Sequence, residues 1–221
     1  MTDITIMSLH LAARPEMVAT ARPKLSGIRK ASVRNADIDE FGLMGDTIVD
    51  TEHHGGADQA VYVYGADDFA WWSEQLGREL APGTFGENVT VDSLGAEWPD
   101  INVGDIYTFG DVELQVTSPR IPCDTFTAHM HETDWMRRFR DARRPGVYCR
   151  VLSGGPIAVG AVGERRGYTD PTLSVLEAQD LFYDSVANRD DAFIERALAG
   201  PMHSKERAQL VAEMARRAAR G

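Results

Sequence analysis

Short apolar stretches rich in β-branched residues alternate with polar or glycine-containing breaks over the first 165 residues. This spacing predicts many short strands, which are typical of a β-barrel or a sandwich. A Phe-Gly-Asp turn at 109–111 predicts a hairpin between two of them. The predicted elements of this part are strands over 4–11, 28–35, 59–64, 88–91, 105–109, 112–117, 147–152 and 157–162, and helices over 67–77 and 132–144.

The pattern becomes helical after residue 165. Ser174 and Glu177 are spaced as a capping box, which predicts a helix start. Two more helices are predicted, one that ends at Gly200 and one that Ser204 caps. The predicted fold class is therefore β-rich α+β, with a barrel-like domain followed by a small all-α extension of three helices. The predicted domains are residues 1–165 and 166–221.

The charge of the chain is strongly negative and unevenly distributed. The formal net charge is −11, from 23 basic and 34 acidic residues, which argues against binding to a nucleic acid polymer. Residues 35–119 contain 18 acidic side chains and a single basic one, Arg78, so the rest of the chain carries 22 basic and 16 acidic residues, a local +6. The total charge therefore does not predict the charge of an individual pocket.

Hydropathy and cysteine content predict a cytoplasmic protein without a membrane partner. The fractions of hydrophobic residues (43%) and charged residues (26%) are those of a soluble globular protein. No run of about 18 apolar residues occurs, and the first residues alternate like a strand instead of resembling a signal peptide. The two cysteines, Cys123 and Cys149, are too few for a disulfide framework.

The first candidate cluster contains Asp46, the adjacent His53 and His54, and the pair Gly55 and Gly56. Adjacent histidines on an extended chain point to opposite sides, so a metal site that uses both is the less favoured interpretation. Two others remain open. The histidine holds neighbouring carbonyl groups in a loop, or the glycine pair forms a turn whose backbone amides face an anionic ligand.

Two further segments, at 85–88 and 117–123, contain candidate site residues. Asn88 follows Phe-Gly-Glu and offers both a donor and an acceptor, either to a ligand or to its own loop. Two prolines flank Arg120 in a stiff loop that ends at Cys123. The arginine favours a reactive thiolate, whereas most free cysteines are small buried hydrophobes. Cys149 lies within a predicted strand, where we expect it to pack in the core.

The order of these segments resembles the MOSC family, named for the molybdenum cofactor sulfurase C-terminal domain. The likeness is greatest to its stand-alone bacterial branch, which carries three C-terminal helices. Each matching stretch is short, and their common order carries the resemblance. One departure is Ala161 after Gly160, where the family usually has an aspartate. The matching stretches are 26–30, 42–46, 53–64, 85–88, 103–105, 118–123 and 145–152.

The resemblance implies a β-barrel-like domain that binds a molybdenum cofactor of the molybdopterin type. Cys123 is the implied metal ligand, and sulfur is a soft donor suited to such a centre. Asp46 is implied either to orient loops or to transfer protons, which would make it catalytic together with Cys123. The implied cofactor-binding residues are Lys30, His54, Gly55, Gly56, Asn88, Arg120 and Cys123.

The implied activity is the reduction of N-hydroxylated small molecules, including hydroxylaminopurine-type base analogues. Electrons would come from a separate reductase, because no nicotinamide or flavin motif is visible in the chain. One alternative is a cofactor-binding or sulfur-carrying accessory protein in which Cys123 bears a persulfide. A third hypothesis is a hydrolase that uses Cys123 with His53 or His54. The remaining expectation concerns the oligomeric state, for which a homodimer is one possibility.

Overall fold

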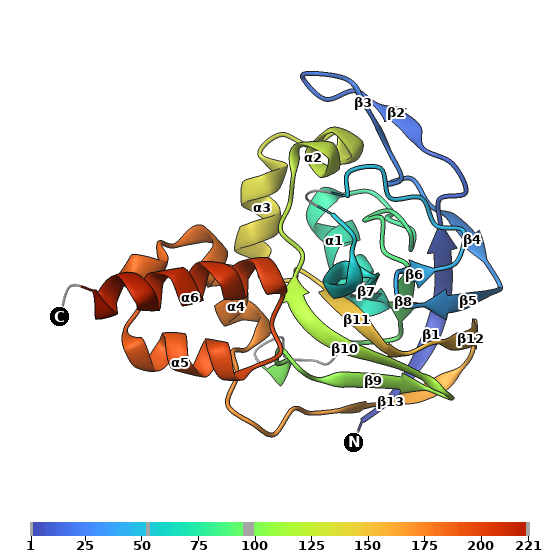
Figure 1. The fold of residues 1–221 in the computed structure, drawn as a ribbon. Helices are drawn as coiled ribbons and strands as arrows, with labels where there is room; N and C mark the ends of the chain where they lie inside the picture. The colour runs from blue at the N-terminus through green and yellow to red at the C-terminus, as the bar shows by residue number, and fades with distance from the viewer. Residues whose placement is uncertain (1, 52–53, 95–99, 220–221) are drawn as a thin grey trace.

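The structure is a computed structural model, and it describes residues 2–51, 54–94 and 100–219. Its central feature is a closed barrel of seven strands, which Figure 1 shows from one side. The barrel strands are β1 (Thr2–Leu11), β7 (Val61–Gly65), β8 (Val89–Val91), β9 (Ile106–Phe109), β10 (Val112–Pro119), β11 (Val147–Ser153) and β13 (Val162–Arg166). Their order is β13-β9-β10-β11-β7-β8-β1, and a pairing between β13 and β1 closes the ring.

Six shorter strands surround the barrel. β4 (Ala31–Val33) pairs with β1, and β5 (Asn35–Asp39), β6 (Gly42–Leu43) and β12 (Gly155–Ala158) form a small sheet. β2 (Glu16–Val18) and β3 (Lys24–Ser26) make a hairpin that projects from the body in Figure 1.

Three helices and an aromatic cluster cover one side of the barrel. The helices are α1 (Ala66–Leu76), α2 (Asp124–Met130) and α3 (Trp135–Ala142). The cluster is fully buried and contains Trp72, Phe85, Phe126, Trp135 and Phe139. Its rings meet at centroid distances between 4.8 and 6.0 Å, which is the range of favourable aromatic pairs. The loop that carries Phe85 is thereby fixed against α2 and α3.

The C-terminal extension shares its core with the barrel. It comprises α4 (Val175–Tyr183), α5 (Asp191–Ala199) and α6 (Ser204–Ala218), with a 3-10 turn η3 (Val186–Asn188) after α4. Val175 and Leu176 of α4 pack in the barrel core, while Val103 of the barrel packs in the core of the extension. In Figure 1 these helices lie beside α3 and the end of β10.

Most predictions about the fold are confirmed. The β-rich barrel followed by three helices is present, as are the 109–111 hairpin and the capping box at Ser174. The predicted domain boundary after residue 165, one residue before the end of β13, stays a prediction. Among the described residues, no helix is both long and apolar enough to cross a membrane.

Two predicted strands are shorter or broken. Residues 28–35 do not form one strand. After the bend at Gly27, which packs against the backbone of Thr47, the chain sends Lys30 inward, and a second bend at Arg34 separates β4 from β5. The strand over 157–162 is interrupted at Gly160, whose φ of 86° ends β12 before β13 begins. Helix α2 was not predicted, because its short polar segment of seven residues has little apolar periodicity.

Candidate functional site

Cys123 lies at the junction of two cavities. It follows β10 and the proline-containing loop and immediately precedes α2, where the extended backbone holds it at the helix start. Its side chain is half-buried. One cavity, of about 110 Å³, lies toward Lys30 and Arg120, and the other, of about 880 Å³, lies toward the C-terminal extension. Five residues line both cavities: Lys24, Asp50, His54, Cys123 and Tyr148.

The surroundings of Cys123 favour its thiolate form. Burial by itself would raise the pKa of this thiol, but the hydrogen bond with His54 and the positive charge of Arg120 outweigh it and lower the pKa to about 6. The sulfur is therefore largely ionised at neutral pH, in the form that ligates metals or attacks electrophiles.

Arg120 is held rigidly beside the thiolate. Its side chain is 7% exposed, and its guanidinium donates to the Phe85 carbonyl over 2.7 Å. The guanidinium carbon also lies 4.9 Å from the ring centre of Tyr62 and 4.2 Å from that of Phe126. These cation–π contacts fix the charge in place without neutralising it.

Lys30, Asp46 and Asn88 form a buried polar network under the small cavity. The Lys30 ammonium donates to Asp46, and the Asn88 amide donates to the same carboxylate over 2.8 Å. The backbone N–H of Ala12 donates to the other Asp46 oxygen over 2.7 Å, and Asn88 accepts from Tyr62 N–H over 3.1 Å. Burial lowers the pKa of Lys30, and the Asp46 carboxylate opposes this lowering. Only Lys30 of the three reaches the described cavity lining.

Glycines allow the loops to approach one another at this site. Gly55 and Gly56 have φ angles of 74° and 77°, and the turn they form follows His54. A Cβ at Gly86, where φ is 71°, would meet the Ile28 backbone oxygen at 3.0 Å, so this loop packs directly on the segment before Lys30. His53 lies outside the described residues.

The small cavity has a positive lining. Three cations, Lys24, Lys30 and Arg120, line it with one carboxylate, Asp50. The larger cavity has four carboxylates and two lysines among its lining residues, so its formal charge is negative. Cys123 therefore faces a positive cavity on one side and a negative one on the other.

Several lining residues were not predicted from the sequence. Tyr148 follows from strand alternation in β11, because its neighbours Val147 and Cys149 are 0% exposed and face the core. The lining from the extension has no local signal in the sequence, because it depends on how α4 and α6 dock on the barrel. It comprises Leu181, Phe182, Asp184, Ser185, Val186, His203, Lys205, Glu206 and Gln209.

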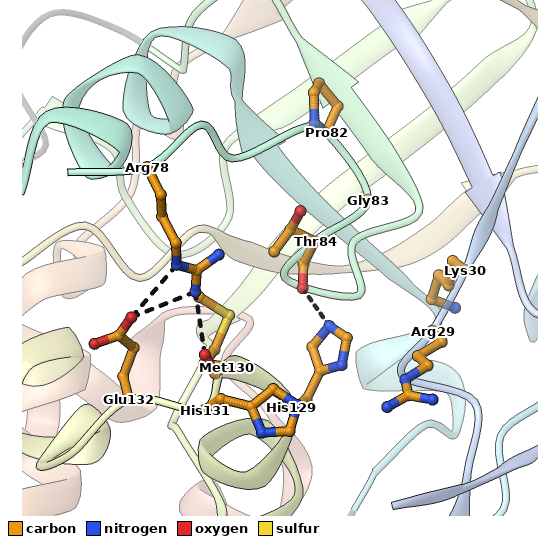
Figure 2. Close-up of a pocket in the computed structure, with 10 residues that line it drawn as sticks. All are labelled: Arg29, Lys30, Arg78, Pro82, Gly83, Thr84, His129, Met130, His131 and Glu132. Carbon is orange, nitrogen blue, oxygen red and sulfur yellow. Dashed lines mark hydrogen bonds and ion pairs between the residues drawn. The ribbon is translucent and has the colours of Figure 1, made fainter. Parts of the chain in front are cut away.

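A separate basic groove of about 490 Å³ also has Lys30 in its lining, and Figure 2 shows the residues that line it. Arg78 binds Glu132 and the Met130 carbonyl there, and the His129 ring lies 2.9 Å from the Thr84 carbonyl oxygen. These contacts tie α2 to the loop before Phe85. The groove contains no cysteine, so we place the candidate site at Cys123.

The side chains at Cys123 have the chemistry to hold a metal that an anionic organic group carries. Within residues 2–51, 54–94 and 100–219, no three histidine, cysteine or acidic side chains gather to hold a metal ion by themselves. A single thiolate beside fixed cations instead suits a metal carried by an anionic organic group, because the sulfur is a soft ligand and the cations balance the group's charge.

Comparisons with known proteins place the chain in a family. The sequence model of the MOSC domain matches residues 50–162. The chain is 30% identical over 196 residues to the uncharacterized protein YflK of Bacillus subtilis, covering 88% of this chain and 87% of that protein. It is 31% identical over 142 residues to a protein of Gibberella moniliformis named "Reductase", covering 62% of this chain and 25% of that protein.

The fold is also similar to a solved structure. The crystal structure of YiiM from Geobacillus stearothermophilus superposes with a TM-score of 0.74 and 25% identity, covering 94% of this chain and 97% of that chain. The similarity therefore extends beyond the barrel and includes the C-terminal helices.

Proposed function

The chain belongs to the MOSC domain family, and from this premise we propose that it is a molybdenum-cofactor-dependent oxidoreductase that reduces N-hydroxylated compounds. The observation that carries the proposal is the position of Cys123, a half-buried cysteine between a positive cavity and a cavity of substrate size. The name of the Gibberella relative is compatible with a reductase.

In this proposal each residue of the site has a separate task. Cys123 binds the metal through sulfur, and His54 holds that sulfur in place through its hydrogen bond. Arg120 and Lys30 balance the negative charge of the cofactor. Asp46 and Asn88 position Lys30. Asp46 accepts from the Lys30 ammonium and from the Asn88 amide, and Asn88 in turn accepts from the Tyr62 N–H. Gly55 and Gly56 shape the adjoining loop. A proton-transferring role of Asp46 stays a prediction.

The reaction converts an N–OH group to N–H and releases water, which requires two electrons and two protons. The bound cofactor would supply the two-electron step, while the protein supplies orientation and electrostatics. Arg120 stabilises negative charge near the sulfur throughout, because its guanidinium is fixed and needs no reorganisation. Electrons would come from a separate reductase in the cytoplasm, with or without dimerisation of this chain.

A second candidate function uses the same thiolate. The Cys123–His54 hydrogen bond is also typical of a sulfur nucleophile, so an accessory protein that carries a persulfide or passes on the cofactor is the alternative. A cysteine hydrolase would share this pair, and it predicts labelling by acyl substrates in the absence of any metal.

The test measures the cofactor content of the protein and its reductase activity in parallel. The protein is purified from a molybdenum-replete host and assayed for molybdenum, pterin and hydroxylaminopurine reduction with an artificial electron donor. We expect bound cofactor together with reduction, loss of activity in Cys123→Ser and near-normal activity in Cys149→Ser. Bound cofactor without reduction would favour the accessory function, and equal loss in both variants would contradict the assignment of Cys123.

A further inference from the structure

The C-terminal extension contributes one wall of the cavity that opens onto Cys123. The end of α4, the turn η3 and the start of α6 line about 880 Å³, together with Tyr148 and the Pro-containing loop of the barrel. This volume lies in the range of small-molecule sites. The extension is fixed there, because Arg143 of the barrel domain forms a two-pronged ion pair with Asp180 of α4 at 2.5 and 3.1 Å.

An aromatic ring on this wall is exposed and yet held in position. Phe182 is 56% exposed and lines the cavity. Its ring packs edge-on against Tyr183 with centroids 5.2 Å apart, and the Arg140 guanidinium lies 5.4 Å from the Tyr183 ring centre. An exposed ring held by neighbouring side chains offers a flat apolar surface at little cost in conformational entropy.

The charge of the lining adds a second selection rule. Asp50, Asp124, Asp184 and Glu206 line this cavity with Lys24 and Lys205. A negative lining disfavours anionic ligands and discriminates between otherwise similar molecules. Gln59, Ser185 and Gln209 supply uncharged hydrogen-bonding groups beside it.

We propose that the extension is the specificity-determining wall of the enzyme. Phe182 stacks on a flat ring that bears the N–OH group, and the carboxylates of the lining reject rings that carry a phosphate. The part of this inference that concerns turnover rests on the proposed function, whereas the part that concerns binding does not.

The first experiment removes the ring. The kcat/KM of the cofactor-loaded enzyme is measured with an N-hydroxylated purine and with hydroxylamine, which has no ring. We expect Phe182→Ala to lower kcat/KM about tenfold for the purine and to leave hydroxylamine unchanged, because stacking on an aromatic side chain is lost only for the purine. Val211→Ala, at an exposed apolar residue of α6 outside the lining, serves as the control. Equal effects of Phe182→Ala on both substrates, or none, would overturn the proposal.

The second experiment changes the charge of the lining. A hydroxylamino-purine nucleoside is compared with its 5′-phosphate, and wild type should prefer the nucleoside at least tenfold in kcat/KM. Gln209→Lys places a positive charge on the wall and should reduce this preference, whereas Ala208→Lys, at a neighbouring exposed position outside the lining, should not. Wild-type enzyme without a preference, or equal effects of both lysines, would contradict the charge rule.

A binding measurement separates failure of this inference from failure of the proposed function. If the wild-type protein reduces no N-hydroxylated compound, calorimetry with adenine and with adenosine 5′-phosphate still tests the wall. The binding part of the inference would be supported if wild type binds adenine more tightly than adenosine 5′-phosphate and if Phe182→Ala weakens adenine binding about tenfold. Equal affinities for the two ligands, or an unchanged affinity of the variant for adenine, would overturn it.

Discussion

At the residue scale, the two cysteines show how environment decides the chemistry of one side chain. Burial raises the pKa of both thiols, and Cys149, which is 0% exposed, has nothing to offset it. Cys123 has His54 and Arg120, which lower its pKa to about 6. Only Cys123 therefore combines an ionised sulfur with access to a cavity.

This difference predicts a pH profile for thiol labelling of the cofactor-free protein. The rate of iodoacetamide reaction with Cys123 should rise with a midpoint near pH 6, because the thiolate is the reacting form. His54→Ala should move this midpoint upward and slow labelling at pH 7 by about tenfold, since an ordinary thiol is only a few per cent ionised there. Cys149→Ser is the control that leaves the profile in place. A midpoint that His54→Ala does not shift would contradict the assigned role of His54.

The sequence indicates much of this site but not its geometry. The proline-flanked loop distinguishes Cys123 from Cys149, whose strand context predicts burial correctly. The pairing of Lys30 with Asp46 is not visible in the sequence, because it depends on the turn at Gly27. The division of charge between two cavities could not be predicted either, because it depends on how the C-terminal extension docks on the barrel.

At the element scale, the start of α6 is anchored to the turn η1 (Ala57–Gln59) of the barrel domain. The Asp58 carboxylate accepts from the Ser204 N–H over 2.8 Å and forms an ion pair with Arg150 at 2.7 Å. The N–H of His203 donates to the Thr117 carbonyl over 3.2 Å. These contacts hold the wall of the larger cavity next to the loop that carries His54.

We predict that Asp58→Asn destabilises the protein by about 1–3 kcal/mol at pH 7, because a partly buried charge-assisted contact is lost. Burial raises the pKa of Asp58, but the Ser204 N–H and Arg150 outweigh it, so the pKa lies below its ordinary value of 3.8. A carboxyl with a lowered pKa contributes stability above the ordinary value and loses it as the pH falls through the folded one. Urea unfolding measures the free energy of unfolding of wild type and variant. The difference between these two free energies should shrink on acidification below pH 4. A difference that grows there would contradict this account.

Elements with strong local patterns were predictable, and elements that depend on distant contacts were not. Strand alternation predicted most barrel strands, and the capping box predicted the start of α4. The hairpin of β2 and β3 has only three residues in each strand, too few for a periodic signal. The predicted Ser204 cap is displaced by one residue, because His203 is the residue that caps α6.

At the scale of the whole molecule, the barrel and the extension act as one structure. Each part contributes side chains to the hydrophobic core of the other. Val175 and Leu176 pack among barrel residues, and Val103 packs among the helices. The chain has a net charge of −11, yet its small cavity is lined by three cations and one carboxylate. The cations beside Cys123 are thus the groups that would balance the charge of the proposed cofactor in a strongly acidic protein.

The central claim is that the sulfur of Cys123 binds molybdenum, and X-ray absorption at the molybdenum edge tests it most directly. Wild-type protein loaded with cofactor and the Cys123→Ser variant loaded in the same way are compared, with Cys149→Ser as the control. We predict that the metal in Cys123→Ser has one sulfur ligand fewer than in wild type, and that Cys149→Ser matches wild type. The same number of sulfur ligands in wild type and Cys123→Ser would contradict the account.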